Sequence, residues 1–148
     1  MSRSRTRTLL VSVRSATPTS TSWAATPSPP PHPPKALVVV DCVDPRAMAR
    51  FWGEAMDWTL HEVTDDHAVL RSAKGVGPYL EFLRTPDAKT AKNRVHLDLR
   101  PYPGDDQAAE VARLRVLGAT DIDLGQGDVP WTCLVDPEGN ESCVLTPR

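Results

Sequence analysis

The pattern of apolar residues, turn residues and helix caps predicts the same order of elements twice: one strand, one helix and then three strands. In the first copy, the β-branched run 36–42 predicts a buried strand. Asp44 followed by Pro45 predicts the start of a helix that continues to Met56, because Asp is a good N-cap and Pro suits the first helical position. Three strands are then predicted over residues 58–63, 67–72 and 79–84.

The second copy repeats this order with a different sequence. Residues 94–100 alternate in character and predict a strand. Asp105 or Asp106 is expected to cap a helix that ends at Leu117, with Gly118 as its C-terminal cap. Strands follow over residues 120–123, 129–135 and 141–146, and the Asp136-Pro137-Glu138-Gly139-Asn140 stretch between the last two predicts a turn.

This order predicts an α+β fold in which two βαβββ modules form a single domain over residues 36–148. Module one spans residues 36–84 and module two spans residues 93–148. Each module can cover the apolar sheet face of the other. We expect their curved mixed sheets to form a half-barrel cleft that suits a small molecule.

Residues 1–35 are predicted to be a disordered tail rich in Pro, Ser, Thr and Arg. They hold seven of the 15 prolines, and residues 29–34 favour polyproline II. Their Arg-rich, acid-free composition also resembles an organellar transit peptide, and a translation start nearer the domain is a third interpretation. The sequence leaves these three open.

The charge of the chain limits the classes of partner that we expect, and its cysteines indicate the redox compartment. The tail is basic, which leaves 12 basic and 19 acidic residues in the remainder, so the predicted domain has a net charge of −7. An acidic domain argues against nucleic acid as a partner. No apolar run is long enough to cross a membrane. Three cysteines without a metal-type spacing favour buried thiols in a reducing cytoplasm. A disulfide between Cys133 and Cys143, on either side of the predicted turn, is the alternative.

Four stretches in this order resemble the glyoxalase-like group of the vicinal oxygen chelate (VOC) superfamily, the glyoxalase/bleomycin resistance/dioxygenase fold. They are Asp41-Cys42-Val43-Asp44-Pro45 with Ala49-Arg50-Phe51-Trp52, then Lys92-Asn93-Arg94-Val95-His96-Leu97-Asp98-Leu99, Leu117-Gly118-Ala119, and Asp136-Pro137-Glu138-Gly139-Asn140-Glu141. The resemblance spans residues 36–145.

The resemblance implies a divalent metal (Zn, Ni, Fe, Mn or Co) held by one residue from the first strand and one from the last strand of each module. Carried over by position, the ligands are Glu81, His96 and Glu141, and Glu141 could also act as a catalytic base. The fourth position falls at Leu37, which has no donor atom. A glyoxalase I acting on methylglyoxal and glutathione is therefore not expected. No motif for a nucleotide cofactor is present.

Further side chains are candidates for lining the cleft. Asp41 is expected on the same strand face as Leu37, and Asp98 and Arg100 on the same strand face as His96. Asp98 and Arg100 are also typical of charged residues at an exposed strand edge. Trp58 and Trp131 are candidate walls. Two functions stay open: a metal-dependent lyase, isomerase or dioxygenase, and a metal-free protein that binds a small, antibiotic-type molecule without catalysis. A monomer and a homodimer are both compatible with the resemblance.

Overall fold

The computed structural model describes residues 36–148, and the expectations for residues 1–35 lie outside this part of the chain. Module one contains β1 (Leu37–Cys42), α1 (Pro45–Met56), β2 (Trp58–Val63), β3 (His67–Ser72) and β4 (Tyr79–Arg84). Module two contains β5 (Leu97–Leu99), α2 (Gln107–Leu117), β6 (Thr120–Asp121), β7 (Thr132–Val135) and β8 (Glu141–Val144). The predicted order of elements is confirmed in both modules.

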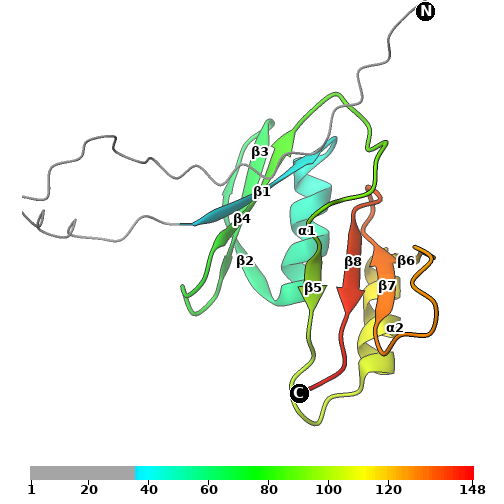
Figure 1. Cartoon of the computed structure of the whole chain (residues 1–148). Helices are drawn as coiled ribbons and strands as arrows, with labels where there is room; N and C mark the ends of the chain where they lie inside the picture. The colour runs from blue at the N-terminus through cyan, green and yellow to red at the C-terminus, as the bar shows by residue number, and fades with distance from the viewer. Residues whose placement is uncertain (1–35) are drawn as a thin grey trace, which may run out of the picture.

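Each module forms a four-stranded mixed sheet with the same topology (Figure 1). The strand orders are β1-β4-β3-β2 and β5-β8-β7-β6. The first strand of each module pairs in parallel with the last, and the remaining pairs are antiparallel. The edge strands β1 and β5 therefore belong to different sheets and face the seam between the modules.

The helices begin and end at residues whose local chemistry favours a cap. Asp44 accepts a hydrogen bond from the backbone N–H of Ala47 at 3.0 Å, and Pro45 opens α1. At α2 the cap is Asp106, which accepts from Ala108 N at 2.8 Å. Gly118 ends α2 at φ 119°, in the left-handed region that a residue with a Cβ rarely adopts.

The strands of module two are shorter than predicted. Strand β5 covers residues 97–99 instead of 94–100, and β7 begins at Thr132 instead of residue 129. Pro130 lacks the N–H that a longer ladder needs, so β7 does not extend through it. His96 and Arg100 flank β5 rather than lying within it.

The core lies between each sheet and its helix. Leu80 and Phe82 of β4 are buried toward α1, where Trp52 and Met48 are also fully buried. In module two, the buried side chains Leu134 and Val144 pack with the α2 residues Val111 and Leu114. None of the helices in residues 36–148 is long and apolar enough to cross a membrane.

The β7–β8 turn of module two joins the two modules. The Glu138 carboxylate accepts hydrogen bonds from the backbone N–H groups of Val43 and Asp44, both at 2.7 Å. These donors lie just before α1, at the helix end where a negative charge is favoured. Arg113 of α2 donates to the carbonyl oxygens of Glu54 and Ala55 at the other end of α1. Both ends of α1 are thus held by module two.

We expect Glu138→Ala to lower the free energy of unfolding by about 1–2 kcal/mol, because two backbone donors lose a charged acceptor. Chemical denaturation followed by circular dichroism measures this loss. The matched control is Asp128→Ala, which removes an exposed carboxylate from a loop of the same module. Equal stability of the two variants would show that the turn does not hold α1.

Candidate functional site

Glu141, a predicted metal ligand and catalytic base, is a buried carboxylate at the start of β8 with only 4% of its surface exposed. Its Oε1 accepts a hydrogen bond from Lys89 Nζ at 2.8 Å, and its Oε2 accepts one from the backbone N–H of Asn93 at 3.0 Å. Burial alone would raise the pKa of Glu141, but these two hydrogen bonds outweigh it and hold the pKa below its usual value. The carboxylate is therefore ionised and neutralised from within the chain.

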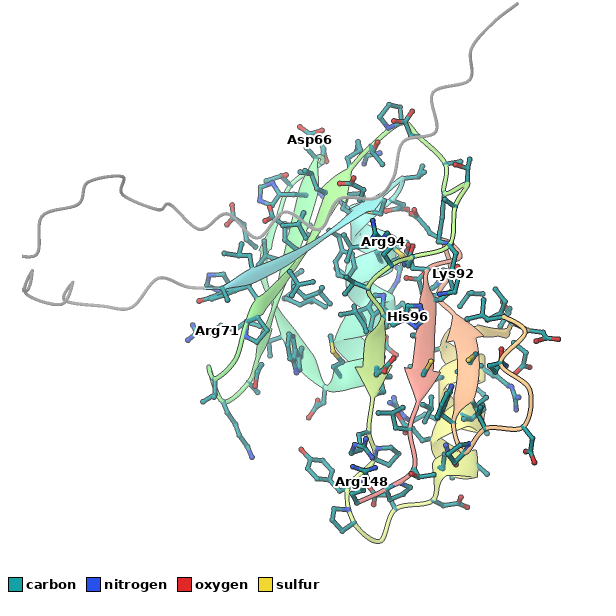
Figure 2. The ribbon with its side chains drawn as sticks, viewed as in Figure 1. Asp66, Arg71, Lys92, Arg94, His96 and Arg148 are labelled. Atoms are coloured by element: carbon teal, nitrogen blue, oxygen red, sulfur yellow. The ribbon has the colours of Figure 1, made fainter. Side chains whose placement is uncertain are left out.

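His96, the second predicted ligand, also lies beside a lysine. Its Nε2 is 3.0 Å from Lys92 Nζ, and its Nδ1 is 4.0 Å from the Sγ of Cys143 (Figure 2). Because an ammonium group can only donate, Nε2 acts as the acceptor and the ring carries its proton on Nδ1. Lys92 is exposed and is also 3.4 Å from the carbonyl oxygen of Asn93.

Glu81 lies on β4, where it pairs with Val39 on one side and Val69 on the other. Its neighbours Leu80 and Phe82 are buried toward α1, so strand alternation places Glu81 on the opposite face, as predicted. Leu37, at the fourth position, pairs with Tyr79 and is 42% exposed.

The predicted ligands do not form one cluster. Within residues 36–148, one group of three or more His, Cys, Asp and Glu side chains has ligand atoms all within 4.8 Å of one another, and it consists of His96, Asp98 and Cys143. Glu81 and Glu141 are outside it. The set Glu81, His96 and Glu141 stays a prediction, and the contacts of Glu141 and His96 weigh against it.

The cysteines are free thiols, as favoured from the sequence, and no disulfide joins Cys133 to Cys143. These two residues are directly opposite each other on β7 and β8, and their Sγ atoms are 3.7 Å apart. Burial raises the pKa of Cys143 to about 12, and the neighbouring Cys133 thiol and Asp98 carboxylate add to this rise. Without a cation nearby, the Cys143 thiol is therefore neutral at physiological pH.

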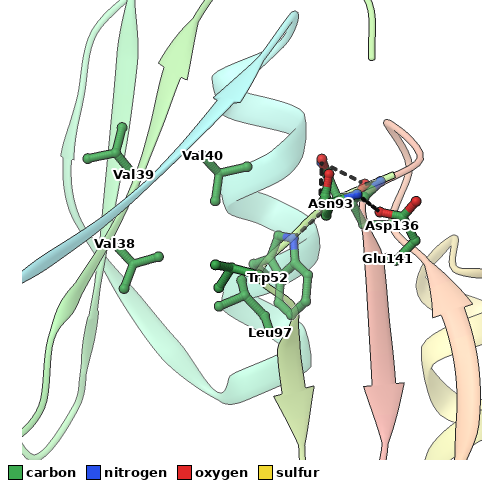
Figure 3. Close-up of a pocket in the computed structure, with 10 residues that line it drawn as sticks. Val38, Val39, Val40, Trp52, Asn93, Leu97, Asp136 and Glu141 are labelled. Atoms are coloured by element: carbon green, nitrogen blue, oxygen red, sulfur yellow. Dashed lines mark hydrogen bonds between the residues drawn. The ribbon is translucent and has the colours of Figure 1, made fainter. Parts of the chain in front are cut away.

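A hollow of about 420 Å³, part of it open to solvent, lies between the modules (Figure 3). Residues 38–40 of β1 and Trp52 of α1 line it from module one. Module two contributes the segment before and within β5 (Asn93, Val95, Leu97) and the end of the β7–β8 turn (Asp136, Asn140, Glu141). The wall is mainly apolar, and its polar groups gather at one end.

One polar atom at that end has no partner. Asn93 is 7% exposed, its backbone N–H reaches Glu141, and its Nδ2 donates to the Oδ1 of Asn140 at 3.4 Å. Its side-chain Oδ1 is buried and has no hydrogen-bond partner among the described residues. A buried acceptor without a donor costs free energy, so this atom is suited to a donor that a ligand supplies.

The same end contains a buried network that sequence reasoning missed. Asp136 Oδ2 accepts from Trp52 Nε1 at 3.1 Å and from Asn140 Nδ2 at 2.9 Å, while its Oδ1 accepts from the backbone N–H of Asn140. Burial raises the pKa of Asp136 against the opposing effect of these hydrogen bonds. The sequence predicted only a turn here, since a contact over 84 residues leaves no local signal.

The remaining predicted cleft residues are spread over the surface. Trp58 and Arg100 line a second, wider groove of about 1320 Å³ between the modules, where acidic residues such as Glu54 and Asp57 prevail. Asp98 belongs to the cluster with His96 and Cys143. Asp41 is exposed and pairs with Leu83 on β4, and Trp131 is 39% exposed. The structure therefore brings together Trp58 with Arg100 and His96 with Asp98.

A family model described as a glyoxalase-like domain matches residues 37–145, which covers both modules. The chain belongs to this family. No curated protein matches this glyoxalase-like chain significantly. A glyoxalase/bleomycin resistance protein/dioxygenase family enzyme from Burkholderia phytofirmans PsJN has a similar structure, with a TM-score of 0.61 and 16% identity over 76% of this chain and 98% of that one.

Two more solved structures are similar to this glyoxalase-like chain. A glyoxalase-related enzyme from Fulvimarina pelagi has a TM-score of 0.56 and 17% identity over 75% of this chain and 86% of that one. A fosfomycin resistance protein from Listeria monocytogenes, solved as an E126Q mutant with Mn(II) and a dihydroxypropylphosphonic acid, has a TM-score of 0.57 and 10% identity over 78% and 90%. At these identities the likeness establishes the fold, and with it the predicted α+β pair of βαβββ modules.

The residues at the family's metal positions do not fit a divalent cation. Leu37 offers no donor atom, and both oxygens of Glu141 already accept hydrogen bonds from Lys89 and Asn93. The Lys92 ammonium stands against the Nε2 of His96. Two lysine side chains thus place positive charge against two of the donors that a metal would need.

We expect Lys89→Met to lower the free energy of unfolding at pH 7 by about 2–4 kcal/mol, because it leaves the buried Glu141 carboxylate without a counter-charge. The pKa of Glu141 is lowered in the folded protein, so the stabilisation is present above the ordinary glutamate pKa. It is lost as the pH falls through the lowered value. The difference between wild type and variant should therefore shrink below about pH 4.

Urea denaturation across this pH range measures the effect. Lys74→Met, which changes an exposed lysine in the turn before β4, is the matched control. Adding Glu141→Gln to Lys89→Met should recover much of the lost stability. Equal losses for Lys89→Met and Lys74→Met would contradict the assigned ion pair.

Proposed function

We propose that this glyoxalase-like protein binds a small, mainly apolar molecule in the hollow between its modules, without a divalent metal at the family's position. The observation that carries the proposal is the side chain of Asn93, a residue that lines an apolar hollow and whose buried Oδ1 has no hydrogen-bond partner in the described part of the chain. A ligand with one N–H or O–H donor satisfies this acceptor while its apolar part displaces water from the walls.

The shape of the hollow supports this function. Its volume of about 420 Å³ includes solvent at the open side, so the space enclosed between the walls suits only a small ligand. Its walls come from both modules, which the Glu138 and Arg113 contacts hold together. A preformed site of this kind loses little free energy to reorganisation when a ligand binds.

The competing hypothesis is a metal-dependent lyase, isomerase or dioxygenase with Glu141 as ligand or base. It requires Glu141 to exchange its hydrogen bonds to Lys89 and Asn93 for a metal, and His96 Nε2 to release Lys92. The Mn(II)-bound fosfomycin resistance protein supports it through the fold alone. The electrostatics of the described residues favour metal-free binding.

A cytoplasmic location accords with three free thiols, two of them within bonding reach after a rotation of their side chains. The ligand's identity, and the choice between a monomer and a homodimer, stay predictions.

Phenol and anisole form a matched pair of probes, because they have similar rings and only phenol donates a hydrogen bond. In protein with isotope-labelled methyl and amide groups, we expect phenol to shift the signals of Val38, Val40 and the Asn93 side chain saturably. Anisole should bind at least about fivefold more weakly, since it leaves Asn93 Oδ1 without a donor.

Val95→Trp should block binding by filling the hollow from its exposed rim, while Val116→Trp, at an exposed valine on α2, serves as the control. Circular dichroism verifies that both variants fold. The proposal fails if phenol and anisole bind alike, or if Val95→Trp leaves phenol binding unchanged.

A further inference from the structure

A cluster of metal-binding side chains lies on one face of the second sheet, outside the proposed pocket. Cys143 of β8 pairs with Asp98 of β5 on one side and with Cys133 of β7 on the other. Paired residues on adjacent strands point to the same face of a sheet. His96 lies two residues before Asp98 and reaches the same face, with its Nδ1 4.0 Å from Cys143 Sγ. The register of β5 and β8 therefore brings three candidate ligands together, His96, Asp98 and Cys143, and Cys133 of β7 lies beside Cys143.

The spacing of these atoms is close to that of a tetrahedral zinc site. With zinc–sulfur bonds of about 2.3 Å, two thiolates of one tetrahedral ion are about 3.8 Å apart. The Sγ atoms of Cys133 and Cys143 are 3.7 Å apart. The ligand atoms of His96, Asp98 and Cys143 are all within 4.8 Å of one another, so small side-chain rotations bring them around one ion.

This cluster shares His96 with the family's metal positions, but its other ligands differ in their chemistry. Two sulfurs and one imidazole are soft ligands that favour Zn²⁺ and Co²⁺, whereas Mn²⁺ and Mg²⁺ favour oxygen. Both thiols are about 95% buried, with exposed fractions of 5% and 6%, and Asp98 is exposed. An ion can therefore enter from the Asp98 side and be held by the buried sulfurs.

We propose that His96 Nδ1, Asp98 and Cys143 form a zinc-type metal site, and that Cys133 completes it as a fourth ligand after a rotation of its side chain. Each thiol that binds the ion releases its proton to solvent, and the His96 proton moves from Nδ1 to Nε2. The protein then holds two thiolates and one carboxylate around a divalent cation. This inference is independent of small-molecule binding in the hollow, because none of the four ligands lines it.

Lys92 opposes this site. In the metal-free protein its ammonium group donates to His96 Nε2 and keeps the ring proton on Nδ1, the atom that must bind the ion. When the metal binds, Lys92 must turn away, and as an exposed side chain it can do so into solvent. Its positive charge also repels the ion. Removing Lys92 should therefore increase the affinity for metal.

The test uses Co(II) as the probe, titrated into the full-length, reduced and metal-free protein. The proposal predicts binding of one Co(II) per chain, with a thiolate-to-cobalt charge-transfer band in the near ultraviolet and strong tetrahedral bands in the visible. Zn(II) should displace the cobalt and abolish the bands. Proton release on binding, measured in a weakly buffered solution, should accompany them.

Single substitutions should change the Co(II) affinity or the charge-transfer band in predictable directions. Cys143→Ser should abolish the charge-transfer band, and Asp98→Asn should weaken Co(II) binding by at least about tenfold, a loss that even outer-shell partners of a metal can cause. Lys92→Met should tighten binding several-fold. Cys42→Ser is the matched control, because Cys42 is a buried thiol in module one that faces the carbonyl oxygen of Leu83.

Asp98 is exposed, so Asp98→Asn keeps the test decisive if Cys143→Ser does not fold. The proposal is overturned if the reduced protein shows no charge-transfer band with excess Co(II), or if the band survives in Cys143→Ser. It is also overturned if Asp98→Asn and Lys92→Met both bind Co(II) as wild type does.

Discussion

The buried carboxylate of Glu141 is the interaction on which the structure between the two modules depends, because its charge must be compensated there. A charge with 4% exposure is costly unless a counter-charge and hydrogen bonds compensate for it. Lys89 and the Asn93 N–H supply both. This arrangement fixes the segment that leads into β5, and so it positions Asn93, His96 and the wall of the hollow.

The ion pair between Lys89 and Glu141 also distinguishes this chain from the metal-bound site that the resemblance to its family implies. A carboxylate that must be neutralised can accept a metal ion or a lysine, and here it accepts Lys89. Lys92 likewise donates a hydrogen bond to His96 Nε2, and Leu37 at the fourth position has no donor atom. The fold matches that of the family, while Lys89 balances the charge of Glu141. In the described part of the chain this leaves an apolar hollow beside the unpaired Oδ1 of Asn93.

Local chemistry made most of the fold predictable. Asp44 with Pro45, and Gly118 after Leu117, mark helix ends through rules that act over a few residues. Alternation also gave the correct face for Glu81, because Leu80 and Phe82 are buried toward α1. The strand ends of module two were less predictable, since they depend on pairing with strands distant in the sequence.

The candidate site was less accessible to such reasoning. Lys89 and Glu141 are separated by 52 positions in the sequence, and Trp52 and Asp136 by 84 positions. No local sequence pattern encodes contacts over such separations. The register that aligns Asp98, Cys143 and Cys133 depends on the paired strands β5, β8 and β7. The sequence carried two signals for this cluster: Cys133 and Cys143 lie on either side of the predicted turn, and Asp98 shares strand parity with His96.

Ligand binding in the hollow is predicted to need no metal at the family's positions. The most direct measurement is the affinity for phenol in protein stripped of metal with a chelator, compared with the affinity in excess Mn(II), which favours oxygen ligands over the cysteine cluster. We predict equal affinities in the two conditions. Phenol binding that appears only with Mn(II), and that Glu141→Gln abolishes, would contradict the account.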